Sequence, residues 1–396
     1  MRREDFTLDA PGGIIQSTLG YEAFLPNALP PELPLTWSLV QALSAADRAV
    51  SELAGVARNL PNPHLLINPF LRREAVLSSR IEGTQASLSD LFVFEASEHS
   101  EAPQSDVEEV VNYIHALEYG LHVIRQGRRI SLTLLKEMHE LLLRDVRGQD
   151  KSPGQFRTKQ NWIAEGSRRL ENARFVPPPV PQMHDALDAL EGYIQAPSDL
   201  PPLVRLALIH YQFETIHPFE DGNGRIGRLL ITLLLCAEGL LPEPLLYLSA
   251  YFERHRDGYV DRLLGVSQSN AWEDWMTFFL TGIAEQGRDG IHRAGRLMEL
   301  RETYRRRLQA GRSSALTLQL TDELFAYPAM SITQTAARLK VTRRAIDLSL
   351  NKLISEKILV ESTGRQRNRV FVAPAIIQII EATEATAGQE KPSDEQ

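Results

Sequence analysis

The chain has 396 residues, of which 43% are hydrophobic and 24% charged, a composition typical of a globular protein with two or three domains. No apolar stretch approaches the roughly 18 residues of a membrane span, and no apolar segment follows the basic start as in a secretory signal. The single cysteine, Cys236, excludes an intramolecular disulfide and a cysteine-based zinc site, so we expect a cytoplasmic protein without membrane contact.

The net charge is −8, but it is unevenly distributed. Residues 301–375 hold 14 Lys and Arg against 6 Asp and Glu, whereas the rest of the chain holds 29 against 45. This asymmetry indicates a basic module attached to an acidic body, and nucleic acid is therefore a candidate partner.

The N-terminal region is predicted to become helical only after an irregular start. The prolines of PNALPPELP exclude a helix within residues 1–35. Helical spacing begins near Trp37, stops at LPNPH, and resumes through LLINPFLRREAVLSSRIEG to Gly83, a residue typical of a helix C-terminus. Residues 94–104 are a polar connection, so we assign residues 1–104 to this region.

The middle of the chain is predicted to be helical with one interruption. Helical patterns follow Ser105 and Ser131 and then dominate from residue 182 onward. Between them, residues 154–181 hold the β-type runs NWIA and ARFV around a polar turn, which predicts a hairpin. We assign residues 105–286 to the core domain and residues 287–312 to an arginine-rich connecting helix.

Residues 313–375 are predicted to form the last unit. The helical patterns SITQTAARL and RRAIDLSLNKLISEK are joined by KVT, and the strand-like runs ILVES and RVFVA flank GRQRNR. Helix, turn, helix and basic hairpin is the order of a winged-helix domain. Residues 376–396 are assigned to a tail, whose end ATAGQEKPSDEQ has the composition of a disordered segment.

The most informative stretch is HPFEDGNGRIGR, residues 217–228, which leads directly into LLITLLLC. The glycine turn, residues 222–224, precedes a helix, where backbone amides and the helix dipole favour an anion. Arg225 and Arg228 lie three residues apart on one helix face, so both can reach the same polyanion.

The two remaining polar residues of the stretch fit the chemistry of a nucleotide. Asp221 does not suit a phosphate directly but suits a divalent metal such as Mg²⁺. His217 can act as a general base for an incoming hydroxyl, and Phe219 is expected to anchor the loop in the core. A helix start with unrelated surface charge is the alternative, but it leaves the combination unexplained. We therefore predict transfer from a nucleoside triphosphate.

The string HPFEDGNGRIGR resembles the HxFx[DE]GNGRxxR signature of the Fic family at all twelve positions. Members of this family transfer AMP from ATP to hydroxyl side chains of target proteins. The resemblance covers roughly residues 30–290. It implies an all-α fold, a Fic-type helical bundle with a small β-hairpin flap, to which the winged helix is appended, and it implies ATP and Mg²⁺ as ligands.

The resemblance also implies a role for each residue of the loop. His217 would deprotonate a Ser, Thr or Tyr hydroxyl of the target, and Asp221 would hold Mg²⁺. The α- and β-phosphates would lie on the glycine turn with the Asn223 side chain on the α-phosphate, and the arginines would hold the β- and γ-phosphates. These nucleotide-binding positions are Gly222, Asn223, Gly224, Arg225 and Arg228. Family members that phosphorylate carry a degraded GNGR part, so the intact string favours AMP transfer.

A second motif, SSRIEG at residues 78–83, resembles the inhibitory [ST]xxxE[GN] motif of the family. Ser78 would be its hydroxyl and Glu82 its acid. In the family this acid pairs with the second motif arginine, here Arg228, and blocks the γ-phosphate position. By itself, Glu82 would be an ordinary solvated helix-end residue. The resemblance therefore implies autoinhibition in cis.

Other residues carry weaker hypotheses. The hairpin at residues 154–181 resembles the family flap, which aligns a target segment by strand addition, with Arg157 and Trp162 as candidates; an ordinary surface hairpin is the alternative. Tyr259, and after it Tyr251, are candidates for the adenine pocket, although aromatic residues at this spacing are more often core. Three histidines are predicted to be core or helix-surface residues: His115, His139 and His210.

The terminal module places cations where a winged helix meets DNA. These are the start of the recognition helix, at Thr342, Arg343 and Arg344, and the wing, at Arg365, Arg367 and Arg369. A protein-interaction or dimerisation unit is the alternative, because the fold alone does not fix function.

The sequence favours an ATP-dependent protein adenylyltransferase but leaves other functions open. Glu82 could instead orient a water that removes AMP from a modified target. The chain could be a DNA-binding regulator that senses nucleotide, or it could use another donor such as CDP-choline or UTP. The expected partners are a hydroxyl-bearing target protein, the protein itself as a target, DNA, and a further copy in a homo-oligomer.

Overall fold

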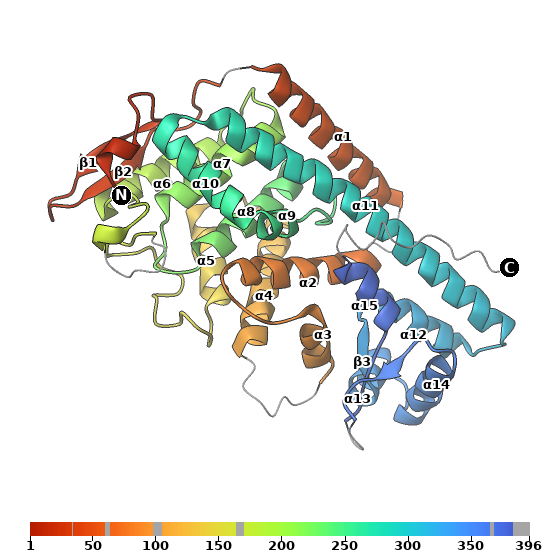
Figure 1. Ribbon diagram of the computed structural model, residues 1–396. Coiled ribbons are helices and arrows are strands. Elements are labelled where there is room, and N and C mark those ends of the chain that lie inside the picture. Colours follow the sequence, from red (N-terminus) through yellow and green to blue (C-terminus); the bar gives the residue numbers. More distant parts are fainter. Residues whose placement is uncertain (34, 60–63, 98–104, 164–169, 365–367, 383–396) are drawn as a thin grey trace.

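The computed structural model describes the chain except residues 34, 60–63, 98–104, 164–169, 365–367 and 383–396. The described part is mostly helical, which confirms the predicted fold class, and two small sheets lie at opposite ends of the molecule (Figure 1). Among the described helices, none combines the length and the hydropathy needed to cross a lipid bilayer.

The helices and strands follow the chain with short connections. The helices up to the glycine turn are α1 Trp37–Asn59, α2 His64–Ile81, α3 Leu88–Ala96, α4 Ser105–Arg125, α5 Leu132–Leu142, α6 Val180–Gln195 and α7 Pro202–Ile216. The later helices are α8 Asn223–Ala237, α9 Ser249–Arg254, α10 Arg256–Ser269, α11 Trp272–Ala310, α12 Ala315–Ala326, α13 Ile332–Leu339, α14 Arg343–Ser355 and α15 Pro374–Glu381. The strands are β1 Gly12–Gln16, β2 Glu22–Pro26, β3 Ala329–Ser331, β4 Val360–Glu361 and β5 Val370–Val372, and short 3₁₀ turns lie at Arg3–Asp5 and Leu170–Asn172.

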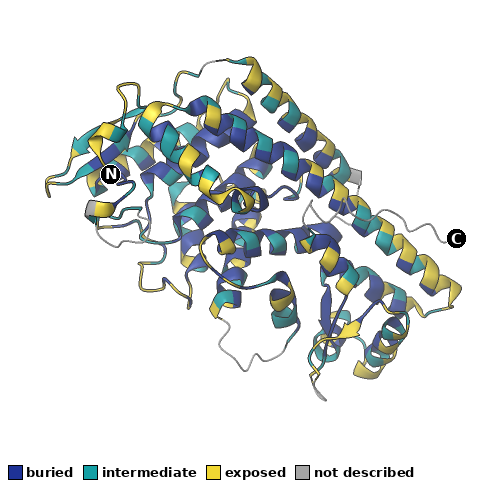
Figure 2. Cartoon of the chain, viewed as in Figure 1, coloured by how far each residue is buried: buried dark blue, intermediate teal, exposed yellow. Residues whose placement is uncertain are grey.

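The centre of the core is the helix pair α7 and α8, which pack against each other. Both are buried on nearly every side, as Figure 2 shows by their dark colour. Apolar residues occupy most positions of both helices, the pattern of a helix enclosed by other helices. The loop that joins α7 to α8 carries the polar motif and is therefore fixed at both ends by the most buried part of the molecule.

Helix α11 extends from the core to the terminal module without a break. The connecting helix that we expected to begin at residue 287 is the second half of this helix, which is continuous over Trp272–Ala310. α1 lies beside it and runs in the same direction (Figure 1). A Cβ on Gly287 would lie 2.9 Å from the Cβ of Ala49, so a glycine allows this close approach.

The prediction that residues 1–35 are irregular is wrong. β1 and β2 form an antiparallel hairpin, and the chain reverses at Gly20, whose φ of 86° favours glycine. Phe24 of β2 is buried, and its amide donates to the carbonyl of Val176 at 2.9 Å. The hairpin depends on this distant partner segment, which the local pattern could not reveal.

In the described part of residues 154–181, the predicted hairpin has one antiparallel bridge, between Ile163 and Phe175. The turn that we expected at its tip lies outside the described residues. Trp162 packs at its base against a small cluster of Ala23, Ala173 and Val176. The N-terminal hairpin thus supports this segment.

The terminal module contains α12, α13 and α14 and a three-stranded antiparallel sheet in the order β3-β5-β4. Thr342 caps α14, because its side chain accepts a hydrogen bond from the amide of Ala345. Helix α15 continues past the predicted tail boundary at residue 375, since its isoleucines are buried against the rest of the chain. Arg365 and Arg367, expected on the wing, lie outside the described residues.

Candidate nucleotide site

The loop between α7 and α8 has two left-handed residues that set its shape. His217 ends α7 with φ 50°, and Gly222 precedes α8 with φ 79°. The second conformation favours glycine, because a side chain there would be strained. Phe219 is fully buried between them and anchors the loop, as predicted. Helix α8 therefore begins at the glycine turn, and its N-terminus is directed at the loop.

Asn223 closes the loop through its side chain. Its Oδ1 accepts from the amide of Phe219 and its Nδ2 donates to the carbonyl of Phe219, both at 2.8 Å. The residue is only 2% exposed. These two bonds to the backbone of Phe219 position the turn, and the expected contact of the second Nδ2 hydrogen with an α-phosphate stays a prediction.

His139 supports the same loop, a role that the sequence did not reveal. Its ring stacks on Phe219 with centroids 3.9 Å apart. Nδ1 accepts from the amide of Gly154 at 3.0 Å, so Nε2 carries the proton and donates to the carbonyl of Asp221 at 2.9 Å. Burial lowers the pKa of His139 to about 4, which keeps the ring neutral and preserves this arrangement.

Arg157 lies beneath the loop rather than at an edge where a target strand would bind. Its Nε donates to the carbonyl of His217 at 3.0 Å and its Nη2 to that of Pro178 at 2.6 Å. The side chain is fully buried, and burial lowers its pKa to about 10. Asn161 adds hydrogen bonds to the carbonyls of His217 and Phe219 at 3.2 and 2.9 Å. The backbone of the loop is thus held from both sides.

The imidazole of His217 has the tautomer of a general base. Its Nδ1 lies 3.2 Å from the carbonyl oxygen of Glu214, which can only accept, so Nδ1 carries the proton and Nε2 has the free lone pair. Burial lowers the pKa of His217 to about 4, and the positive charge of Arg157 acts in the same direction. The ring is therefore neutral near pH 7.

The start of α8 has the donors of an anion site. Within the described chain, the backbone amides of Asn223, Gly224 and Arg225 have no protein acceptor. Such amides at a helix N-terminus favour an anion. The carboxylate of Glu82 lies beside this turn, because an ideal Cβ on Gly224 would be 2.4 Å from its Oε1. The sequence motif at the end of α2 thus meets the glycine turn in space.

Arg228 links the two motifs. Its Nη2 donates to Oε1 of Glu82 at 2.7 Å and to the carbonyl of Ser78 at 3.0 Å, and its Nε donates to Oγ of Ser78 at 2.8 Å. Burial alone would raise the pKa of Glu82, but the charge and hydrogen bond of Arg228 outweigh it and lower the pKa. Glu82 is therefore a carboxylate that neutralises a buried guanidinium.

The remaining arginine is buried and less completely paired. Arg225 is 2% exposed, and its nearest acids are Glu109 at 3.6 Å and Asp221 at 3.7 Å. Its Nε and Nη1 have no hydrogen-bond partner. Unsatisfied donors on a buried cation are costly, so the site is electrostatically suited to an added anion.

Asp221 is the residue suited to a metal. Its side chain is 43% exposed, and one carboxylate oxygen accepts from the amide of Gly222 at 2.6 Å. Among the described residues no group of three or more His, Cys, Asp or Glu could enclose an ion. Mg²⁺ commonly uses only one or two carboxylates together with phosphates, so a single exposed carboxylate beside an anion site fits it.

Tyr259 and Tyr251 do not line an open adenine pocket, which corrects the expectation for both. Tyr259 is 4% exposed, stacks on Phe252 at 4.3 Å, and shares a hydrogen bond of 2.7 Å with Nε2 of His210. Tyr251 is buried against Phe278. Both belong to the aromatic core, and His210 is a core histidine, as predicted.

Comparisons with known proteins agree with this geometry. The model of the Fic/DOC family N-terminal region matches residues 40–122, and that of the Fic/DOC family matches residues 129–235. A Fic family protein from Desulfovibrio desulfuricans has a similar fold, with a TM-score of 0.56, 19% identity, and coverage of 87% of this chain and 98% of that one.

Two curated relatives are named as protein adenylyltransferases. The protein from Nematostella vectensis is 28% identical over 170 residues, which is 42% of this chain and 37% of that protein. The fic-1 protein of Caenorhabditis elegans is 30% identical over 120 residues, or 30% of this chain and 22% of that protein. The chain thus spans less than half the length of either relative. Residues 40–122 thus match the N-terminal region of the Fic/DOC family, and residues 129–235 match its Fic domain.

Proposed function

We propose that this protein transfers AMP from ATP to a Ser, Thr or Tyr hydroxyl of a target protein, and that Glu82 inhibits the transfer in cis. The observation that carries the proposal is the position of the Glu82 carboxylate, over Gly224 and bound to Arg228 at 2.7 Å. A negatively charged group thus occupies Arg228, one of the donors that a triphosphate would need. The names of the curated relatives support the same reaction class.

The reaction follows from the state of His217. A target hydroxyl gives its proton to Nε2, the nitrogen with the free lone pair, and its oxygen attacks the α-phosphorus of ATP. The new oxygen–phosphorus bond forms as the bond to the β-phosphate breaks, and pyrophosphate leaves. Mg²⁺ held at Asp221 would neutralise charge on the phosphates.

The phosphates are held by the chain's own donors. The free amides at the start of α8 bind the phosphate oxygens, and Arg225 supplies donors that the protein leaves unsatisfied. Arg228 joins them when Glu82 moves away. Buried donors aimed at developing charge stabilise a transition state more strongly than donors in water.

Inhibition follows from competition for Arg228. A guanidinium that donates to a carboxylate and to Ser78 cannot also bind a γ-phosphate in the same geometry. The Glu82 side chain is 35% exposed, so it can leave the site without disrupting the core. Release of the segment around residue 82 would therefore switch the enzyme on.

The decisive experiment uses ATP labelled at the α-phosphate, Mg²⁺ and a cell lysate. The wild type should label itself and its target slowly, Glu82→Gly should label at least about tenfold faster, and adding His217→Ala should lower that rate by about 10²–10⁴-fold. Equal rates for wild type and Glu82→Gly would reject cis inhibition. Label retained after His217→Ala would reject the assigned base.

The same experiment separates the alternative reactions. Parallel incubations with labelled UTP or CDP-choline would reveal another donor. Incubation of an AMP-modified target with each variant would reveal removal of AMP, in which Glu82 would orient a water. Release of AMP that depends on Glu82, without transfer by Glu82→Gly, would favour the removal reaction.

DNA is a second candidate partner for the terminal module, with a winged helix as the proposed fold. Arg343 and Arg344 are exposed at the start of α14, directly after the cap at Thr342. This is the place from which a recognition helix contacts phosphates and base edges. A fluorescent duplex should bind with an affinity that falls as salt rises, and more weakly to the Arg343→Gln, Arg344→Gln double variant. Equal binding by the double variant would show that DNA contacts another part of the chain.

A further inference from the structure

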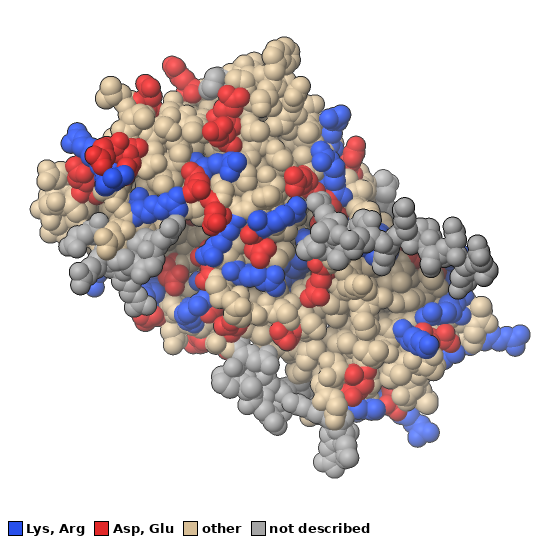
Figure 3. Space-filling view, viewed as in Figure 1, with Lys and Arg blue, Asp and Glu red and all other residues tan. Residues whose placement is uncertain are grey.

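A cavity of about 600 Å³ lies on the far side of the inhibitory helix from the loop. Its walls come from α2, α3, α9, α11 and α15, so it joins the core to the end of the terminal module. In Figure 3 basic and acidic side chains alternate over the middle of this face, where Figure 1 places α2 and α9. The volume is that of a small-molecule site.

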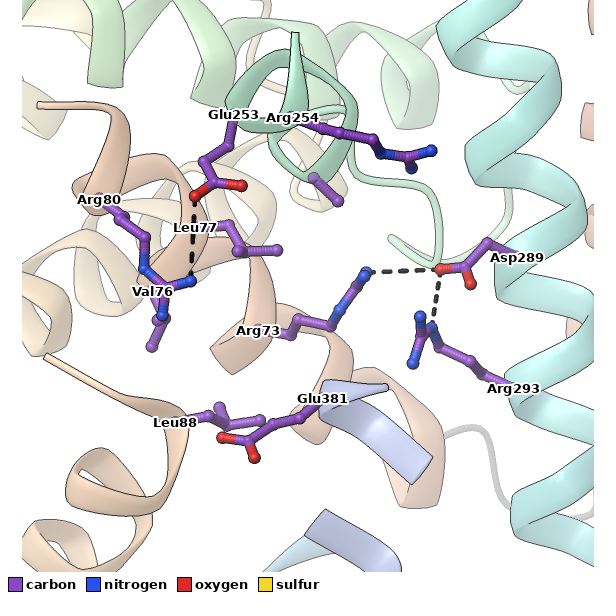
Figure 4. A pocket seen from close by; sticks show the side chains of 11 residues that line it. Arg73, Val76, Leu77, Arg80, Leu88, Glu253, Arg254, Asp289, Arg293 and Glu381 are labelled. Atoms are coloured by element: carbon purple, nitrogen blue, oxygen red, sulfur yellow. Dashed lines mark hydrogen bonds and ion pairs between the residues drawn. The ribbon is translucent and has the colours of Figure 1, made fainter. Parts of the chain in front are cut away.

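The lining combines an apolar wall with an excess of positive charge. Val76, Leu77, Leu88 and Ala250 are its apolar residues. Its charged residues are four arginines, Arg73, Arg80, Arg254 and Arg293, and three acids, Glu253, Asp289 and Glu381. Figure 4 shows these side chains converging on the cavity from different helices.

The arginines differ in how completely they are paired. Arg293 donates to Asp289 at 2.7 Å and to the carbonyls of Ile379 and Ile380 at 2.6 and 3.0 Å, so it fastens α15 to α11. Arg73 has only a longer ion pair with the same Asp289, at 3.5 Å, among the described residues. The carboxylate of Asp289 thus pairs with both Arg73 and Arg293, and it lies closer to Arg293.

Arg73 is therefore a partly buried cation without a full set of acceptors. Its side chain is 17% exposed, and burial together with the charge of Arg293 lowers its pKa to about 10. The pair between Arg80 and Glu253 is also long, at 4.0 Å. A buried guanidinium lacking close acceptors is stabilised by an anion, particularly by the oxygens of a phosphate or carboxylate.

We propose that this cavity binds a small organic anion, with an apolar body against Val76 and Leu77 and a phosphate or carboxylate group on Arg73. The arginines at its edge, Arg80 and Arg254, assist the approach of the anion. The apolar wall selects against inorganic phosphate, and the arginines select against neutral compounds.

The test is calorimetric titration of the full chain with phenyl phosphate, inorganic phosphate and benzyl alcohol. Phenyl phosphate should bind most tightly, and Arg73→Gln should weaken it by about tenfold or more, the loss expected for a charged hydrogen bond. The partly exposed Arg254→Gln should weaken it by about threefold without risk to folding. Equal binding of phenyl phosphate and benzyl alcohol would overturn the proposal.

Two control variants locate the bound anion. Arg129→Gln alters a second cavity between α4 and α8, and Arg228→Gln alters the glycine turn. Arg129→Gln should not change the affinity measured for the α2 cavity, and Arg228→Gln should change it less than Arg73→Gln does. Loss of binding with either control, or no loss with Arg73→Gln and Arg254→Gln while circular dichroism shows folded protein, would reject the assignment.

Occupation of the cavity also bears on inhibition, a consequence that rests on the proposed function. Leu77 lines the cavity, and the next residue, Ser78, holds Arg228. A ligand that joins α2 to α11 stabilises the docked helix and so keeps Glu82 in place. Phenyl phosphate should slow AMP transfer by the wild type at least twofold but not by Arg73→Gln. Absence of AMP transfer in all variants would reject the proposed function. The calorimetric titrations would still test separately whether the α2 cavity binds an anion.

Discussion

The loop between α7 and α8 and the Glu82 segment that lies beside it are held in opposite ways. The loop is fixed from several directions: His139, Arg157, Asn161 and Asn223 bind the backbone of its residues 217–221. Glu82 instead reaches it through one hydrogen bond to Arg228, with its side chain 35% exposed. A loop that must keep its geometry is held by many mutually supporting hydrogen bonds. A carboxylate that must leave the site, as we propose for Glu82, is held by few.

The comparison predicts that loosening the turn has the largest effect. His139→Ala removes a stacked ring and two hydrogen bonds to buried backbone groups, so the free energy of unfolding should fall by about 2–4 kcal/mol. Urea denaturation followed by circular dichroism measures this change. The exposed His115→Ala is the matched control and should change it by less than about 0.5 kcal/mol. Similar losses for both would show that the turn does not depend on His139.

The second prediction separates the charge of Glu82 from its volume. Glu82→Gln keeps an acceptor near Arg228 but replaces a charged hydrogen bond by a neutral one, so AMP transfer should rise about fivefold, less than in Glu82→Gly. Initial rates of labelling with α-labelled ATP measure the effect. The exposed Glu108→Gln should leave the rate unchanged. If Glu82→Gln transferred AMP as slowly as the wild type, the volume of the side chain beside Arg228 would explain inhibition without its charge.

A smaller change is expected at the hydroxyl of the inhibitory motif. Ser78→Ala removes the bond between Oγ and Nε of Arg228 but leaves the bond to the Ser78 carbonyl and the pair with Glu82. The docked state should lose about 0.5–1.5 kcal/mol, so transfer should rise about two- to tenfold. Combined with Glu82→Gly, the Ser78 change should have little further effect, and additive effects would argue that the two residues act separately.

A change of pH near neutrality is expected to have the smallest effect on the rate of AMP transfer. The pKa of Glu82 is lowered, so its pair with Arg228 is complete above about pH 4.5 and is lost as pH falls through the lowered pKa. His217, with a pKa of about 4, stays neutral over the same range. Transfer by Glu82→Gly should therefore change less than about twofold between pH 6 and 8 and decline toward pH 4. A midpoint near 6.5 would show that His217 is not desolvated.

The sequence predicted most of the helices because their determinants are local. Gly83 ends the segment after α2 with φ 96°, and Ser131 caps α5 through the amide of Leu134. Periodic apolar residues and such caps act within a few residues of themselves. The N-terminal hairpin was missed for the opposite reason, since its strand β2 is completed by Val176.

The same distinction separates the residues of the site. The string from His217 to Arg228 predicted its own chemistry, because the residues proposed as base, metal ligand, anion turn and phosphate-binding arginines are contiguous. His139 carried no such signal: its two ring nitrogens bind backbone groups of Gly154 and Asp221, and backbone contacts leave no trace in residue type. Tyr259 had the right residue type for a nucleotide site but was placed in the core by its neighbours.

The sequence by itself determined which helices form, which loop carries the polar groups and which acid matches an inhibitory motif. Only the tertiary structure decided that Glu82 lies beside Gly224, that Asn223 binds the backbone of Phe219, and that Arg73 and Arg293 share the carboxylate of Asp289. The physical reason is that caps and periodicity act over a few residues along the chain. Pairing between a charge and its partner depends instead on which segments the packed core brings together.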